Sequence, residues 1–408
     1  MGIYFNPNHT DFYNAVNHSQ IYVDKTELIQ YTNSVLFGEQ KYICVSRPRR
    51  FGKSMAANML TAYYSRGCDS RKLFQGLKIA THPDFEKHLN QYNVIHLNMQ
   101  NFLSKTQTIE QMIALVTKAV GRDLLRAYPD VDYLDKTILT FMLDDIYQDC
   151  QVPFIFIIDE WDCIFRSRKN QLEEQTKYLD FLRDLLKDKS YIALAYMTGI
   201  LPIKKYGEHS AINVFYEYSM TDASPIEEFT GFTEQEVQQL CEQYNMPFSE
   251  TKKWYDGYCV DGVSIYNPKS VVEAMLRGKF SNYWTQTETY EALKIYIQSN
   301  EFGVQDVILK LLAGEKEKID TTTFSNDMIT FATKDDVLTL LVHLGYLTYD
   351  AETKEIWIPN DEVMEQFIST VKIMGWGSVV TALETSEKLL QATLSGDEQT
   401  VAELIEQA

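Results

Sequence analysis

A chain of 408 residues is longer than one ordinary hydrophobic core supports, so two or three domains are expected. With 45% hydrophobic residues and only 18 Gly and 10 Pro, the composition excludes extended disorder. The formal net charge of -19 excludes broad electrostatic attachment to nucleic acid or to an anionic membrane. The one dense basic stretch is "RPRR", at 47–50.

The N-terminus lacks a basic segment followed by an apolar one, and no apolar run is long enough to span a bilayer. We therefore expect neither secretion nor membrane insertion. Six scattered cysteines without a C-x-x-C pair favour reduced thiols over a disulfide framework or a zinc site. Together these features predict a cytoplasmic protein. The cysteines are Cys44, Cys68, Cys150, Cys163, Cys241 and Cys259.

The first half of the chain alternates apolar strands with amphipathic helices. Such alternation predicts a parallel sheet covered on both faces, the α/β layout of a P-loop NTPase core, over residues 1–225. One helix carries a predicted apolar stripe of Leu172, Leu179, Leu182, Leu185 and Leu186. The predicted strands are 41–45, 94–99, 154–159, 191–197 and 214–220, and the predicted helices are 106–127, 134–149 and 171–189.

Beyond residue 225 the pattern becomes mainly helical, and we predict a helical lid over 226–300. A helix followed by a two-stranded hairpin at 334–360 predicts a winged-helix-like module within 301–375. Residues 376–408 read as two helices broken at "SGD", in the position of a linker to a further domain. The lid and module helices are predicted at 232–245, 267–276 and 286–312.

The stretch "SRPRRFGKS" (46–54) poses the functional question. It matches the phosphate-loop pattern G-x-x-x-x-G-K-[ST], except that Arg47 replaces the first glycine. A buried strand precedes it and a helix follows, which is the context that the pattern requires. Lys53 is predicted to reach the outer phosphates, and the Ser54 hydroxyl is predicted to bind Mg²⁺. The predicted nucleotide-binding residues are Arg47, Pro48, Arg49, Arg50, Phe51, Gly52, Lys53, Ser54 and Met55. The three arginines either add positive charge beside the nucleotide or face outward.

The apolar strand "FIFIID" ends in a second polar signature. Asp159 is predicted to orient Mg²⁺, and Glu160 to polarise the attacking water. Thr198, at the end of the strand "YIALAYM", is either a sensor of the γ-phosphate, as in additional-strand ATPases, or a simple strand cap. Lys204 and Lys205 either contact phosphate or a partner, or are solvated. An arginine finger would come from Arg166, from Arg168 or from a neighbouring subunit.

Several stretches together resemble the bacterial AAA-ATPase-like family, whose members carry a P-loop ATPase domain and commonly a C-terminal nuclease domain of the PD-(D/E)XK superfamily. The resemblance is dense over about residues 1–290. It implies ATP as the nucleotide and places Lys53, Ser54, Asp159 and Glu160 in the ATP-site roles given above. The stretches are "YVDKTELI" (22–29), "SRPRRFGKS", "IIDEWD", "MTGILPIKK", "GFTEQEV", "WYDGY", "IYNPKSVV" and "NYW".

The nuclease needs an acidic residue and an E-x-K motif on strands. Glu352 and Lys354 have this spacing after Asp350, but they fall in the polar turn of the predicted hairpin, so we expect no nuclease activity from this chain.

Three functions remain in competition. The first is an ATPase switch that controls an effector domain or partner, such as a nuclease acting on DNA. The second is a DNA-binding or protein-interaction adaptor in which ATP is structural. The third is an inactive interaction protein. DNA bound through the hairpin module and a second copy of the chain are the macromolecular partners that we consider.

Overall fold

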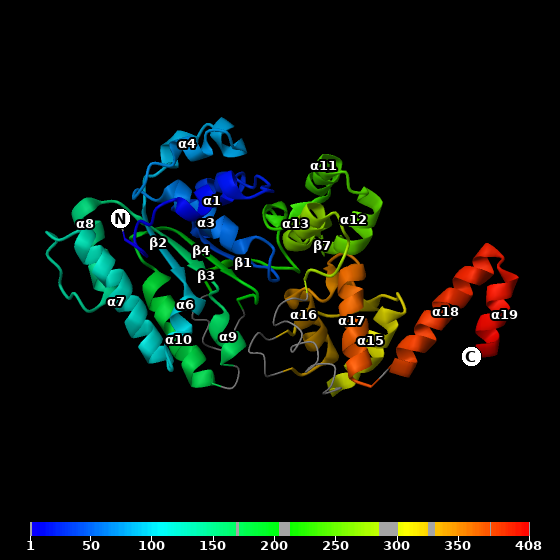
Figure 1. Ribbon diagram of the computed structural model, residues 1–408. Coiled ribbons are helices and arrows are strands. Elements are labelled where there is room, and N and C mark those ends of the chain that lie inside the picture. Colours follow the sequence, from blue (N-terminus) through cyan, green and yellow to red (C-terminus); the bar gives the residue numbers. More distant parts are fainter. Residues whose placement is uncertain are drawn as a thin grey trace.

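The computed structural model describes residues 2–168, 171–203, 213–284, 301–324, 331–375 and 377–407. A five-stranded parallel sheet in the order β2-β3-β4-β1-β5 forms the centre of the first half (Figure 1). β4 lies between the strands that lead to the phosphate loop and to the acidic pair, which confirms the additional-strand arrangement. The strands are β1 Tyr42–Ser46, β2 Asn93–Asn98, β3 Phe154–Asp159, β4 Ile192–Gly199 and β5 Tyr216–Tyr218.

Alternate side chains of the strands feed two separate cores, because neighbouring residues of a strand point to opposite faces. Ile155 and Ile157 of β3 pack with α1, α2, α3 and α5, whereas Phe154, Phe156 and Ile158 pack with α7, α8 and α10. The helices of the first face are α1 Thr10–His18, α2 Leu28–Val35, α3 Lys53–Tyr64, α4 Arg71–Phe74 and α5 Phe85–His88. Those of the second are α6 Met99–Leu103, α7 Ile109–Ala127, α8 Leu139–Cys150, α9 Cys163–Ser167 and α10 Leu172–Leu186.

The predicted leucine stripe of α10 is wrong at its first position. Leu182, Leu185 and Leu186 are buried, but Leu172 is 55% exposed, because the helix begins there, beyond the edge of the core.

The predicted lid contains strands that the sequence analysis missed. A small antiparallel sheet, β6-β8-β7, runs beside three helices. Its strands span only two to four residues, too few to show an alternating pattern. The elements are β6 Phe232–Thr233, α11 Glu234–Tyr244, α12 Phe248–Tyr255, β7 Tyr258–Val260, β8 Val263–Tyr266 and α13 Pro268–Arg277.

The predicted helix and hairpin are present as α16, β10 and β11, and β9 adds a third strand beside β11. α16 begins at a capping box between Thr333 and Asp336 and ends at Gly345, whose φ of 86° needs a residue without Cβ. The elements are α15 Val304–Leu312, β9 Glu317–Lys318, α16 Lys334–Leu344, β10 Thr348–Asp350, β11 Glu355–Trp357 and α17 Asp361–Ile373.

Two last helices, α18 Gly377–Ser395 and α19 Glu398–Gln407, turn back on each other at the predicted "SGD" break and project from the body (Figure 1). No helix in the described ranges is both long and apolar enough to cross a membrane. Of the predicted helix 286–312, the part before residue 301 lies outside the described residues.

Candidate functional site

The phosphate-loop sequence folds as the pattern predicts, between the end of β1 and the start of α3. Gly52, just before the helix, has φ 88°, a left-handed conformation that L side chains rarely adopt. A Cβ built there would meet nothing within 4 Å, so the backbone angle rather than space requires glycine. The N-terminus of α3 consequently opens toward the carboxyl ends of the strands, where its free N–H groups favour an anion.

Lys53 is folded back onto its own loop. Its Nζ donates hydrogen bonds of 2.9 Å to the backbone carbonyl oxygens of both Arg47 and Pro48, and the residue is only 5% exposed. Burial lowers its pKa, and the nearby carboxylates Glu160 and Asp159 oppose that effect. A bound phosphate would replace these carbonyl oxygens as the hydrogen-bond acceptor of the buried Lys53 ammonium.

Polar side chains from three other elements meet at Asp159. Ser54 Oγ of α3 donates to its Oδ2 at 2.7 Å, and the Thr198 hydroxyl of β4 donates to its Oδ1. Asn98 Nδ2, from the end of β2, lies 3.4 Å from Oδ2. Because β2 and β3 pair with Asn98 opposite Asp159, the parallel register itself places the two side chains together. Sequence reasoning missed Asn98, although its place at a strand end was a signal.

Glu160 lies beside the cavity in an ion pair with Arg166 of α9. Arg166 Nη2 donates to Glu160 Oε2, and its Nε donates to Asp162 Oδ2 at 3.1 Å. Asp162, fully buried, also accepts the backbone N–H groups of Ile200 and Leu201 at 3.1 and 2.9 Å. Burial alone would lower the pKa of Arg166, but the carboxylates of Asp162 and Glu160 raise it above its ordinary value.

Neither predicted arginine-finger residue is available in this arrangement. Arg166 is bound to its own chain's carboxylates, and Arg168 Nη2 donates to the Gln107 carbonyl at 2.5 Å while its Nη1 lies 3.6 Å from Glu174. Lys204 and Lys205 lie outside the described residues.

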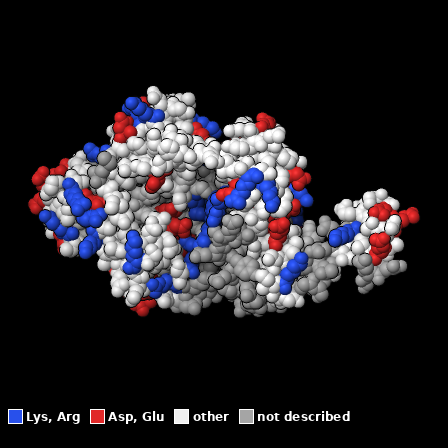
Figure 2. All heavy atoms as spheres, viewed as in Figure 1, with Lys and Arg blue, Asp and Glu red and all other residues white. Residues whose placement is uncertain are grey.

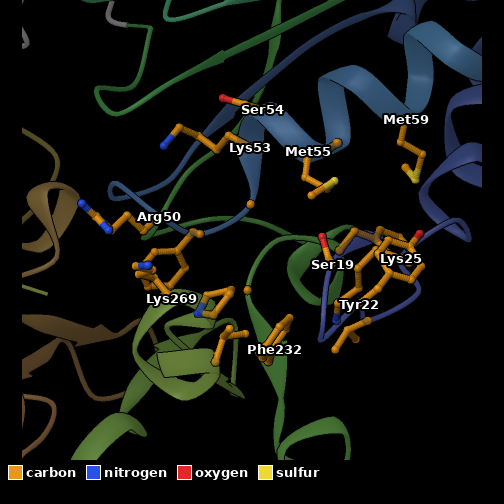
Figure 3. A pocket seen from close by; sticks show the side chains of 18 of the residues that line it. Ser19, Tyr22, Lys25, Arg50, Lys53, Ser54, Met55, Met59, Phe232 and Lys269 are labelled. Atoms are coloured by element: carbon orange, nitrogen blue, oxygen red, sulfur yellow. The ribbon is translucent and has the colours of Figure 1, made fainter. Parts of the chain in front are cut away.

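A cavity of about 440 Å³ opens beside the loop, within the size range of small-molecule sites. One end is polar and includes Lys53, Ser54 and Glu160. The other is apolar: Met55 and Met59 of α3 lie across the cavity from Tyr22, with Phe232 of β6 nearby (Figure 3). Met55 is 40% exposed, so it lines the cavity instead of the helix core. A polar end at a helix N-terminus joined to an apolar end matches a phosphate chain joined to a flat base.

The N-terminal segment and the predicted lid meet at this cavity through Lys25. Its Nζ donates to Glu236 Oε2 of α11 at 2.5 Å and to the Glu228 carbonyl at 2.7 Å. The neighbouring Asp24 accepts the N–H and hydroxyl of Thr26 at 2.9 and 2.7 Å, and the N–H of Lys78. Sequence reasoning gave Lys25 no role, because the lid residues that it contacts are about 200 positions away.

Of the predicted nucleotide-binding residues, Arg49, Arg50, Phe51, Gly52, Lys53, Ser54 and Met55 line the cavity. Arg47 and Pro48 lie behind the loop. Arg47 Nη1 donates to the carbonyl oxygens of Ser46, Tyr218 and Ser219 at 2.9, 3.0 and 2.8 Å. Complete burial lowers its pKa to about 10, so it stays charged at neutral pH. The arginine in the first glycine's place thus ties the loop to β5 through its side chain.

The "ETK" motif lies in the turn between β10 and β11, as predicted. Glu352 and Thr353 donate backbone N–H groups to Asp350 Oδ1 at 2.8 and 3.3 Å, and Lys354 has φ 58°. Asp350 is therefore occupied in ordering the turn. Within the described ranges, no group of three or more His, Cys, Asp and Glu side chains is arranged to hold a metal ion by itself.

Comparisons with known proteins concern the first half of the chain most directly. Residues 8–207 match the model of the family described as "Predicted AAA-ATPase". An uncharacterized protein from the vnfD 5' region of Azotobacter chroococcum is 23% identical over 275 residues, which cover 66% of this chain and 51% of that protein. The chain thus spans about half the length of this curated relative.

Solved structures with similarity include two from Aeropyrum pernix. The ORC2 protein in ADPNP-ADP complexes has 13% identity and a TM-score of 0.36, covering 87% of this chain and 97% of that one. The ORC1 protein in complex with DNA has 10% identity and a TM-score of 0.31, covering 90% and 98%. At these scores the fold is assigned from the strand order of this chain itself.

Proposed function

This chain belongs, through residues 8–207, to the family of predicted AAA-ATPases, and we propose that it binds ATP with Mg²⁺, hydrolyses it slowly, and acts as a nucleotide-dependent switch for an effector domain or partner. The observation that carries the proposal is the loop 46–54. One side of it faces the polar end of the cavity, and the other side packs against the lid and the helix-hairpin module.

The residues present fit a nucleoside triphosphate and a hard divalent cation. Lys53 and the N-terminus of α3 would hold the β- and γ-phosphates. Ser54 and Asp159 already share a hydrogen bond, and their oxygens are the ligands that Mg²⁺ takes. When bound, Mg²⁺ would neutralise charge on the phosphate oxygens. Tyr22, Phe232, Met55 and Met59 offer apolar surface to the base.

Glu160 is the residue that we propose to orient and polarise the attacking water. For this, its carboxylate must be free to accept a proton or hydrogen bond from water, and Arg166 now occupies one of its oxygens. Ser54 and Thr198 donate to different oxygens of Asp159. The Thr198 hydroxyl would therefore respond when a phosphate and its cation engage the Asp159 carboxylate. Slow turnover follows if the ion pair must open before water is positioned.

A chain of contacts runs from the loop to the module and supports the switch. The Phe51 carbonyl accepts the Gly231 N–H at 2.9 Å, and the Phe51 and Tyr258 rings are nearly perpendicular with their centroids 5.1 Å apart. Tyr258 Oη in turn donates to the Gly345 carbonyl at the end of α16, at 2.9 Å. A Cβ added at Gly345 would lie 2.8 Å from Pro48 of the loop. Movement of the loop on phosphate binding would therefore displace packed groups in both parts.

The DNA-binding alternative is less favoured by the packing of α16. In a winged-helix reader, the helix before the hairpin presents one face to the DNA groove. Here every residue from Asp336 to Leu344 is buried, so this arrangement leaves α16 no free face. The net charge of -19 argues in the same direction.

The test is a titration of a fluorescent ATP analogue with Mg²⁺, followed by phosphate release from the same samples. Wild type should bind and turn over. Lys53→Ala should bind at least about tenfold more weakly, and Glu160→Gln should bind normally while losing about 10²-fold or more in turnover. Lys72→Ala, an exposed lysine on α4, is the control. Absence of binding by the wild type at millimolar Mg·ATP would leave the fold without this function.

A further inference from the structure

A second concave surface lies far from the nucleotide cavity, along α7 and α10. It encloses about 920 Å³ between these helices and the loop at 136–137. Ile113, Ala114 and Leu125 of α7 line it and are partly or well exposed, which gives it an apolar floor. We call this surface the α7 groove.

The α7 groove has a basic rim on a strongly acidic protein. Its lining contains five Lys and Arg residues against one Glu: Lys118, Arg122, Arg126, Lys136 and Lys177, with Glu110. Lys177 is neutralised by Glu110 and Glu173 at 2.6 and 2.7 Å, and Arg122 lies 3.2 Å from Asp123. Within the described residues, Lys118, Arg126 and Lys136 make no ion pair. The groove therefore presents unneutralised positive charge above apolar surface.

The projecting pair α18 and α19 has the opposite character. Residues 377–408 contain six acidic side chains and a single lysine, a net charge of -5. Leu390 and Leu394, four residues apart on one face of α18, are 55% and 73% exposed, and Ile405 of α19 is 61% exposed. Exposed apolar residues on an acidic helical hairpin mark a surface that the described part of the chain leaves uncovered.

We propose that the α18–α19 hairpin of one copy docks into the α7 groove of a second copy. The leucine face would cover the apolar floor, and the acidic side chains would meet Lys118, Arg126 and Lys136. α7 and α18 both have 19 residues, so each extends about 28 Å and the two can lie side by side over their full length.

A second copy fits better than the other occupants. Figures 1 and 2 place α7 and the projecting hairpin at opposite ends of the molecule, so the hairpin cannot reach the groove of its own chain. A nucleic-acid backbone would use the basic rim but not the apolar floor, and it would meet a body of charge -19. At physiological salt, screening over about 8 Å weakens the repulsion between two acidic bodies and leaves the local contacts.

The arrangement is head-to-tail, because each copy offers one hairpin and one groove. Such contacts either close into a ring or continue as a filament. A copy with an altered groove and a copy with an altered hairpin retain only one compatible hairpin–groove contact between them. This property gives a test that separates the α7 groove from any symmetric contact between two hairpins.

The experiment is sedimentation velocity on the full chain over roughly 1 to 100 µM, the range in which moderate contacts assemble. The groove variant is Lys118→Glu/Arg126→Glu, and the hairpin variant is Leu390→Ser/Leu394→Ser. The control, Lys72→Glu/Lys279→Glu, makes the same change of net charge at exposed sites elsewhere. Wild type and control should associate beyond dimers, and each variant alone should associate at least about tenfold more weakly.

An equimolar mixture of the groove variant and the hairpin variant should form a 1:1 complex that grows no further. A wild type that stays monomeric throughout would overturn the proposal. So would a groove variant that associates like the wild type, which would indicate a hairpin-to-hairpin contact. If the groove variant associates like the wild type but is no longer retained on duplex DNA, the groove would instead be assigned to nucleic acid. Circular dichroism and binding of the ATP analogue, both expected to be unchanged, show that each variant is folded and separate this test from that of the ATP site.

Discussion

The two sides of the loop 46–54 use similar residues for opposite purposes. On the cavity side, Lys53 and Ser54 are hydrogen-bonded within the chain. A phosphate could replace the partners of Lys53, and a cation could replace the hydrogen bond of Ser54. On the hidden side, Arg47 and Pro48 are buried, and Arg47 is fully occupied at Nη1 by three carbonyl oxygens. A basic residue in a phosphate loop is therefore not by itself a phosphate ligand. Its backbone position decides which side it serves.

The largest expected effect separates the two sides by stability. Arg47→Ala should lower the free energy of unfolding by about 3–5 kcal/mol, since it leaves the Tyr218 and Ser219 carbonyls buried without their donor. Lys53→Ala should change stability by less than about 1 kcal/mol, because burial of its ammonium is itself unfavourable. Urea denaturation of both variants with unchanged slope measures this.

A larger loss of stability in Lys53→Ala than in Arg47→Ala would contradict this difference between the two sides of the loop. In that case the carbonyls of Arg47 and Pro48 would need the lysine to keep the loop folded, and the cavity side would be structural as well.

A second prediction concerns the contact between the loop and the module. Gly345→Val should cost about 3 kcal/mol, from its φ of 86° together with the collision with Pro48. Gly314→Val is the matched control: it has φ 80° but nothing within 4 Å of an added Cβ, so it should carry the backbone cost alone, about 1–2 kcal/mol. Thermal unfolding gives both values.

The affinity of the same two variants for the ATP analogue tests whether the contact between Gly345 and Pro48 affects the loop. Gly345→Val should weaken binding of the ATP analogue, because Pro48 must move, and Gly314→Val should not. Equal affinities in the two variants would mean that α16 does not act on the loop.

The smallest expected effect lies where the lid meets the module. Glu362 of α17 accepts hydrogen bonds from Ser270 Oγ at 3.0 Å and from the N–H groups of Tyr283 and Trp284 at 2.6 and 2.9 Å. Burial raises its pKa to about 7. A carboxyl whose folded pKa is raised binds its proton more tightly in the folded state, so its contribution to stability is lost as pH rises from about 4.5 to 7.

Glu362→Gln keeps the accepting oxygen without the charge. The free energy of unfolding of this variant minus that of the wild type should increase by about 2–3 kcal/mol as the pH rises from 5 to 8. Chemical denaturation of both proteins at each pH measures the difference. A constant difference across this range would show that Glu362 is ionised in the folded protein throughout.

Sequence reasoning placed the strands and the helix that carry the candidate site because the relevant signals are local. The run "FIFIID" predicted β3 to the residue, and "GKS" predicted the start of α3 within its context. It missed the strands of the lid, which are too short for a periodic pattern, and it placed Leu172 in a core that ends before that residue. It listed Met55 among the nucleotide-binding residues, and Met55 lines the cavity.

The amino-acid sequence by itself determined which residues are candidates for the chemistry: a glycine that can take a left-handed angle, a lysine, a serine and an acidic pair at a strand end. Periodicity and turn preference act over a few residues, so they can be read from the chain alone. Only the tertiary structure decided how these residues are held. Arg166 is only six positions from Glu160, but Arg47 reaches the Tyr218 carbonyl of β5 about 170 positions away, and Pro48 meets Gly345 almost 300 positions away. Such contacts depend on strand order and on how the module packs, and no local pattern encodes them.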